Sequence, residues 1–155
     1  MTGSNWVRVG AVLGFLAVAL GAFGAHGLKA KLDALGTGAN YQTAVLYHMF
    51  HALAILGVGL LARVNPENRA VSVAGWSFLL GVLVFSGSLY VLALTGMKWL
   101  GAITPIGGLA MLVGWAALAA GAPQTPGQSG WTVSSPDSTM RLEEPHPAAK
   151  PKDHP

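Results

Sequence analysis

The 155-residue chain has no cysteine and very few charged residues. Without cysteine it can form no disulfide, thiol nucleophile or thiolate metal site. Charged residues make up 10% of the sequence, whereas soluble domains contain about 25%. Acidic residues are absent from all four of its long apolar stretches. Because carboxylates inside a membrane usually serve ion or proton pathways, the sequence argues against a carboxylate-driven pump or an ion-coupled carrier.

Sequence motifs of the common catalytic and nucleic-acid-binding classes are missing as well. The chain has no Gly-rich phosphate loop, nucleophile elbow or catalytic triad pattern, and we therefore expect no enzyme. The net charge is +3, but the basic residues are scattered and form no patch with aromatic residues. We expect no nucleic-acid partner. Such residues instead anchor helix ends to lipid headgroups, so the lipid bilayer is the expected partner.

Four apolar stretches, at about 9–28, 34–62, 70–97 and 99–122, dominate the first part of the chain. A helix crosses the hydrocarbon core with about 20 apolar residues. The sequence therefore predicts membrane spans at about 6–25, 41–62, 70–94 and 99–121. The short connections after the second and third spans require antiparallel neighbours. The predicted fold is all-α, an integral membrane four-helix bundle of up-down-up-down topology with both termini on one side.

Two regions outside the spans have a distinct composition. Residues 122–155 contain seven of the nine prolines among Gly, Ser, Thr and Gln, and cannot bury enough apolar area to fold. We therefore predict a transmembrane domain over 1–121 and a disordered Pro-rich tail over 122–155. In the connection 27–40, Leu28, Leu32 and Leu35 recur at helical spacing, which is compatible with a short interfacial helix or with a loop.

Small residues recur at helical spacing in the first and third spans. In membranes they let helix backbones approach closely, so we expect the first span to be a central packing helix. Tryptophans 6, 76, 99 and 115 lie near predicted span ends, where interfacial tryptophans usually occur. The residues predicted to pack helices are Gly10, Gly14, Ala17, Gly21, Gly24, Ser77 and Gly81.

Polar side chains inside the predicted spans are the candidate functional residues. His51 is the strongest candidate because it lies near the middle of the second span. In hydrocarbon we expect a neutral ring, which still needs one donor and one acceptor, and nearby hydroxyls could supply them. The candidate cluster comprises His26, Tyr47, His48, His51, Ser86, Ser88, Tyr90 and Thr104.

The three histidines of this cluster leave several functions open. They could form an interhelical hydrogen-bond network, bind haem or a metal, or handle a substrate or protons. An H-x-x-H pair is a weak metal motif, and the H-E-x-x-H form is absent. We therefore expect no metal site and no cofactor.

Several motifs, in order along residues 5–121, resemble the YgdD-type family of small four-span bacterial inner-membrane proteins with a domain of unknown function. They include Gly24-Ala25-His26-Gly27, His51-Ala52-Leu53-Ala54, Ser86-Gly87-Ser88, Thr104-Pro105 and Gly114-Trp115. The resemblance implies a bacterial inner-membrane location and supplies no catalytic residue. It favours His26, His51, Ser86, Ser88, Tyr90 and Thr104 as positions that define the fold or site, whereas glutamine can replace His48.

The leading functional hypothesis is a small integral membrane protein with a structural, assembly or envelope-maintenance role. The alternatives are a small-solute transporter or channel that acts as an oligomer, and a haem- or metal-binding membrane protein. Candidate protein partners are further copies of the chain or other membrane proteins. Three Lys or Arg residues flank the spans on each side, so their count does not decide the orientation. The basic C-terminal ends of family members favour cytoplasmic termini.

Overall fold

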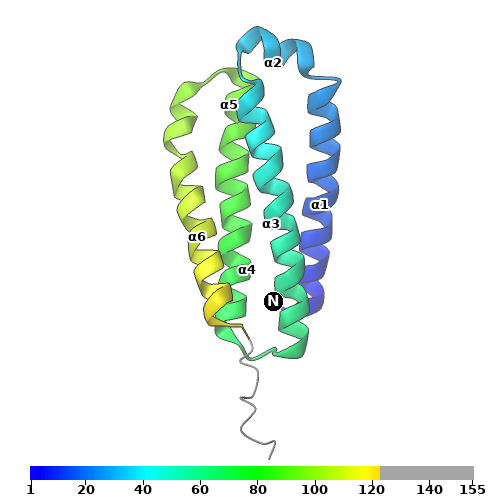
Figure 1. Ribbon diagram of the computed structural model, residues 1–155, viewed down its shortest axis with the longest axis vertical. Coiled ribbons are helices and arrows are strands. Elements are labelled where there is room, and N and C mark those ends of the chain that lie inside the picture. The colour runs from blue at the N-terminus through cyan, green and yellow to red at the C-terminus, as the bar shows by residue number, and fades with distance from the viewer. Residues whose placement is uncertain (123–155) are drawn as a thin grey trace, which may run out of the picture. The chain divides into compact units, whose positions relative to one another are not determined.

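The computed structural model describes residues 1–122, which form helices and short connections without any strand (Figure 1). The predicted disordered tail therefore lies almost wholly outside the described residues. The helices are α1 (Gly3–Ala25), α2 (Lys29–Leu35), α3 (Gly38–Val64), α4 (Arg69–Gly81), α5 (Gly87–Thr95) and α6 (Thr104–Ala120). A π-helical turn, η1 (Val82–Ser86), joins α4 to α5, and a 3-10 turn, η2 (Lys98–Ala102), precedes α6.

Four helical segments are long and apolar enough to cross a membrane: 3–25, 38–64, 69–95 and 98–120. Neighbouring segments run in opposite directions, and the start of α1 and the end of α6 lie at the same end of residues 1–122 (Figure 1). The predicted all-α membrane bundle with up-down-up-down topology is confirmed. The π-helical turn inside the third segment was not foreseen, because hydropathy does not distinguish it from α-helix.

The packing order differs from the expectation that the first span is central. α1 packs mainly against α3, and α6 packs mainly against α4 and η1, so α3 and α4–α5 lie between the two outer helices (Figure 1). Only 17% of the apolar window of α1 is buried, against 44% in the α4–α5 segment. The glycines of α1 that make close contacts face α3, whereas large side chains such as Phe15 and Phe23 are exposed.

The small residues on α1 do not all contact α3 closely. A methyl group at Gly10 would lie 2.9 Å from the backbone nitrogen of Leu56, and one at Gly24 would collide with the Tyr41 ring. Gly21 approaches Val45, whereas a methyl group at Gly14 would meet nothing within 4 Å. On the α4–α6 side, Gly81 faces Met111 and Gly107 faces the Phe85 backbone. Ser77 is half-buried.

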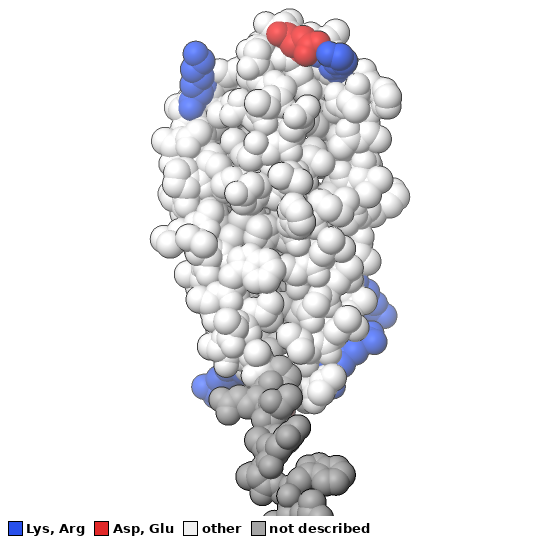
Figure 2. All heavy atoms as spheres, viewed as in Figure 1, with Lys and Arg blue, Asp and Glu red and all other residues white. Residues whose placement is uncertain are grey.

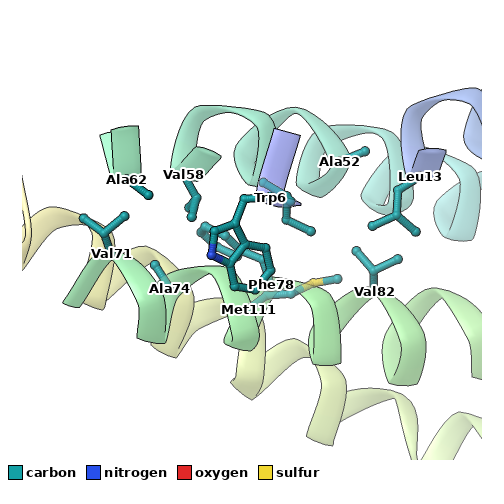
Figure 3. Packing of buried hydrophobic residues seen from close by; sticks show 11 residues of the cluster. Trp6, Leu13, Ala52, Val58, Ala62, Val71, Ala74, Phe78, Val82 and Met111 are labelled. Atoms are coloured by element: carbon teal, nitrogen blue, oxygen red, sulfur yellow. The ribbon is translucent and has the colours of Figure 1, made fainter. Parts of the chain in front are cut away.

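The largest buried side chains join α1, α3, α4 and α6 around Trp6 and Phe78 (Figure 3). Trp6 is 0% exposed, so its expected interfacial position is wrong. Gly75 on α4 makes this burial possible, because a methyl group there would lie 2.6 Å from the Trp6 ring. The indole therefore fills the space between helices instead of reaching the headgroups.

Local signals explain where the helices begin and end. The side chain of Asn68 caps α4 by accepting from the Ala70 backbone at 3.0 Å, and its amide donates to the Gly121 carbonyl at 2.9 Å. Pro105 lies in the first turn of α6, where its missing N–H has no consequence. Gly36 has a positive φ of 64° and ends α2. The connection 27–40 therefore contains a short helix, one of its two expected forms.

Charged side chains gather at the two ends of the described bundle, and a wide uncharged band separates them (Figure 2). One end carries Arg8, Arg63, Glu67 and Arg69, and the other carries Lys29, Lys31, Asp33 and Lys98. This distribution suits a protein whose uncharged band faces lipid hydrocarbon and whose ends meet water and headgroups.

Candidate functional site

The central residue of the candidate site is His51, halfway along α3 and only 5% exposed. Its Nδ1 lies 2.8 Å from the carbonyl oxygen of Tyr47, and its Nε2 lies 3.3 Å from the indole nitrogen of Trp115 on α6. A carbonyl only accepts and an indole N–H only donates. The ring must therefore be neutral, with its proton on Nδ1. The expected hydroxyl partners of His51 are wrong, since a carbonyl and an indole take both nitrogens.

Aromatic rings surround His51 and fix its orientation. Its ring centroid is 5.5 Å from that of Phe78 and 6.1 Å from that of Trp115, and these two rings are in turn 5.0 Å apart, edge to face. The Tyr47 ring stacks on the imidazole with centroids 6.0 Å apart, and its centroid is 4.5 Å from that of Phe85. Rings at these separations attract one another, so α3, the α4–α5 segment and α6 are joined through one aromatic cluster.

A groove of about 510 Å³ lies beside His51, between α3, η1 and α6. Its walls include Phe85, Pro105 and Leu112, and the half-exposed rings of Tyr47 and Trp115. No charged residue lines it. The groove can therefore accept an apolar group from the bilayer, with the His51–Trp115 hydrogen bond at its side, but it offers no charged catalytic group.

A second polar contact joins the start of α6 to α5. The hydroxyls of Ser88 and Thr104 lie 2.9 Å apart. The second hydroxyl proton has a backbone acceptor in either arrangement, because the Phe85 carbonyl lies 3.0 Å from the Ser88 hydroxyl and the Leu100 carbonyl lies 3.3 Å from the Thr104 hydroxyl. Since one hydroxyl donates to the other, this pair is satisfied within the fold and links two helices at membrane depth.

His48 and Ser86, unlike Ser88 and Thr104, each have a buried polar atom without a hydrogen-bond partner in the described chain. His48 Nδ1 lies 3.4 Å from the Tyr90 hydroxyl, a long contact, and its Nε2 has no partner within residues 1–122. Ser86 is 1% exposed and its hydroxyl is also unpartnered in that range. Ser86 is the last residue of the π-helical turn, an element that often occurs at functional sites.

His26 does not join the cluster. It follows α1 as the C-cap, its side chain is exposed, and it makes no side-chain hydrogen bond to the described residues. Residues 1–122 also contain no group of three or more His, Asp or Glu side chains placed to hold a metal ion. The structure thus brings together Tyr47 with His51, His48 with Tyr90, and Ser88 with Thr104.

Trp115 is the site residue that sequence reasoning left out of the candidate cluster. Its position near a span end suggested an interfacial anchor, and its indole donates to Nε2 of His51. The adjacent Gly114 makes room for this cluster, because a methyl group there would lie 2.5 Å from the Phe78 ring. The Gly114-Trp115 pair among the family-like motifs was the one signal that could have indicated this role.

Comparison with known proteins decides the family. The protein-family model described as "Protein of unknown function (DUF423)" matches residues 20–108. The chain belongs to the DUF423 family. That range contains His51, the π-helical turn and the Ser88–Thr104 pair. Trp115 lies beyond it, within the longer stretch that individual relatives share.

Two bacterial relatives illustrate how much of the chain this similarity covers. The UPF0382 membrane protein YwdK of Bacillus subtilis is 44% identical over 110 residues, 71% of this chain and 89% of YwdK. The UPF0382 inner membrane protein YgdD of Escherichia coli K12 is 43% identical over 126 residues, 79% of this chain and 92% of YgdD. No solved structure shows significant similarity. This DUF423 protein is therefore a membrane protein, and its four helices are long and apolar enough to cross a membrane.

Proposed function

We propose that this DUF423 protein has a non-catalytic, structural or assembly role in the bacterial inner membrane, where its polar cluster locks the helices together. The observation that carries the proposal is the double hydrogen bonding of His51. Both ring nitrogens are used by partners within the fold, so the ring has no free nitrogen for a ligand and no free site for a proton. The Ser88–Thr104 pair is satisfied internally in the same way.

The two alternatives gain less support from the same geometry. A haem or metal ligand needs a free imidazole nitrogen. His51 offers none, and His26 stays outside the cluster. His48 has a free Nε2, but within residues 1–122 it belongs to no group of three or more His, Asp or Glu side chains placed to hold a metal ion. A transporter needs a polar pathway, and the groove beside His51 is lined by apolar and aromatic side chains. The name of YgdD supports an inner-membrane location, and we place both termini on the cytoplasmic side.

A double-mutant cycle tests the proposed lock. We expect Trp115→Phe, which removes the indole donor together with part of the ring, to lower stability, and His51→Ala to lower it further by removing the ring at the centre of the aromatic cluster. The coupling energy between the two positions should be about 0.6 kcal/mol, the average for such bonds in membranes, with an upper bound of about 1.7 kcal/mol. Trp99→Phe is the matched control, since Trp99 is 64% exposed. Unfolding of the purified proteins in micelles, followed by far-UV circular dichroism, gives the stabilities of the wild type, the two single variants and the double variant.

Two further measurements on the same variants separate this role from the alternatives. In cells whose only copy is Trp115→Phe, we expect less protein in the membrane and greater sensitivity to membrane-disrupting detergent, whereas Trp99→Phe cells behave as wild type. Stoichiometric metal or a haem absorption band in the wild-type protein that is lost in His51→Ala would overturn the proposal. So would flux of a defined solute through reconstituted protein that His51→Ala abolishes.

A further inference from the structure

Besides the groove next to His51, a hollow of about 440 Å³ lies near the start of α3. At this end of the bundle α2 connects α1 to α3 (Figure 1). Gly21 and Gly24 of α1 line the hollow, and the Tyr41 ring and Val45 of α3 lie directly against these two glycines. The opposite wall comes from α3, where Tyr41 is held by a 2.8 Å hydrogen bond from its hydroxyl to the Leu20 carbonyl. The hollow therefore has firm walls, and its volume is that of a small-molecule site.

The hollow is apolar inside and charged at its rim. Leu32, Val45 and Leu46 supply apolar lining, whereas Lys29 and Asp33 of α2 line it with opposite charges. The Lys29 ammonium and the Asp33 carboxylate form an ion pair of 2.7 Å, and their side chains are 68% and 62% exposed. Acidic and basic atoms lie together at this end of the molecule (Figure 2). The rim thus faces the headgroup layer, and the interior continues toward the hydrocarbon.

The charge pattern of the rim selects among lipid headgroups. An anionic headgroup without an amine would pair with Lys29 but would be repelled by Asp33. A choline headgroup carries no N–H with which to bond the carboxylate. A primary-amine zwitterion offers a phosphate acceptor for Lys29 and an ammonium donor for Asp33. Because an exposed ion pair contributes little stability, a headgroup can replace the internal Lys29–Asp33 contact at low cost.

We propose that this hollow binds a phospholipid with a zwitterionic, primary-amine headgroup, such as phosphatidylethanolamine. The phosphate lies against Lys29, the ammonium lies against Asp33, and one acyl chain lies over the apolar lining formed by Val45 and Leu46. The site shares no side chain with the His51 cluster, so it stands independently of the structural role proposed above. It adds a specific lipid to the partners of the protein.

The test uses the full chain in micelles to which phosphatidylethanolamine, phosphatidylcholine or phosphatidylglycerol with identical acyl chains is added. Native mass spectrometry measures the lipid retained by each variant. We expect the wild type to retain phosphatidylethanolamine about fivefold better than either competitor, as one favourable headgroup charge contact predicts. Asp33→Asn should abolish the preference over phosphatidylglycerol. Lys29→Gln should lower retention of all three lipids.

Lys31→Gln is the matched control, because Lys31 lies on the same short helix but does not line the hollow. It should leave retention and selectivity unchanged. Equal retention of the three lipids by the wild type would overturn the proposal, as would an unchanged selectivity in Asp33→Asn. All three substitutions fall at exposed positions, and matching far-UV circular dichroism spectra establish that each variant is folded.

Discussion

Alanine substitutions at Gly10 and Gly14 should have opposite effects on stability, although the two glycines lie one helical turn apart on α1. A methyl group at Gly10 would lie 2.8 Å from Leu56 Cγ, 2.9 Å from the Leu56 backbone nitrogen and 3.0 Å from the Ala52 carbonyl oxygen. Ordinary contacts are about 3.5–4.0 Å long. Two of the three atoms belong to the backbone, so α1 must move away from α3. At Gly14 the methyl group would meet nothing within 4 Å.

The magnitude follows from two terms. Replacing glycine by alanine inside a helix stabilises it by about 0.5–1 kcal/mol, and this gain is common to both variants. Overpacking costs about 1–3 kcal/mol and applies to Gly10→Ala alone. The two variants should therefore differ by about 1–3 kcal/mol. At about 2–4 °C per kcal/mol for a chain of this size, Gly10→Ala melts several degrees below Gly14→Ala, which equals or exceeds the wild type.

Thermal unfolding of the full chain in micelles measures the difference. Far-UV circular dichroism reports loss of helix. Tryptophan emission reports the average environment of the five tryptophans, to which Trp6 contributes the 0%-exposed ring at the α1–α4 contact. Equal melting temperatures for the two variants would refute the α1–α3 packing described above. A lower melting temperature for Gly14→Ala would show that the small-residue stripe packs with a different register.

Two further predictions concern the π-helical turn and the start of α6, and the same melting assay tests both. Ser86→Ala removes a buried hydroxyl without a partner in the described chain, so it should leave stability unchanged or raise it. Ser88→Ala breaks the bond to Thr104 and should cost about 1 kcal/mol of stability. A larger loss of stability in Ser86→Ala than in Ser88→Ala would indicate that Ser86 is bonded. Gly107→Ala forces a methyl group into the Phe85 backbone and should destabilise the protein. In Gly108→Ala the atom nearest to the new methyl group would be 3.6 Å away, so this variant should fold normally. Equal stability of the two variants would contradict the α6–η1 contact.

The candidate site was only partly predictable, because Trp115, Phe78 and several pairings could not be read from the sequence. His51 stood out as an ionisable residue in the middle of an apolar run, and Ser88 and Thr104 stood out as hydroxyls within spans. The indole of Trp115 was not expected as a partner of His51. A tryptophan that only faces lipid and one that also bonds a neighbouring helix look alike in a sequence, because the facing helix decides which acceptor the indole meets.

The sequence by itself determined the membrane location, the four spans and their alternating directions. These follow from the length of the apolar runs and the shortness of the connections, since every backbone polar group in hydrocarbon must be bonded within a helix. Which helix lies inside the bundle, which glycines are close contacts and which atoms His51 bonds were decided by tertiary structure alone. The reason is that lipid tails are as apolar as the side chains between the helices, so hydropathy cannot tell a lipid-facing side chain from a buried one.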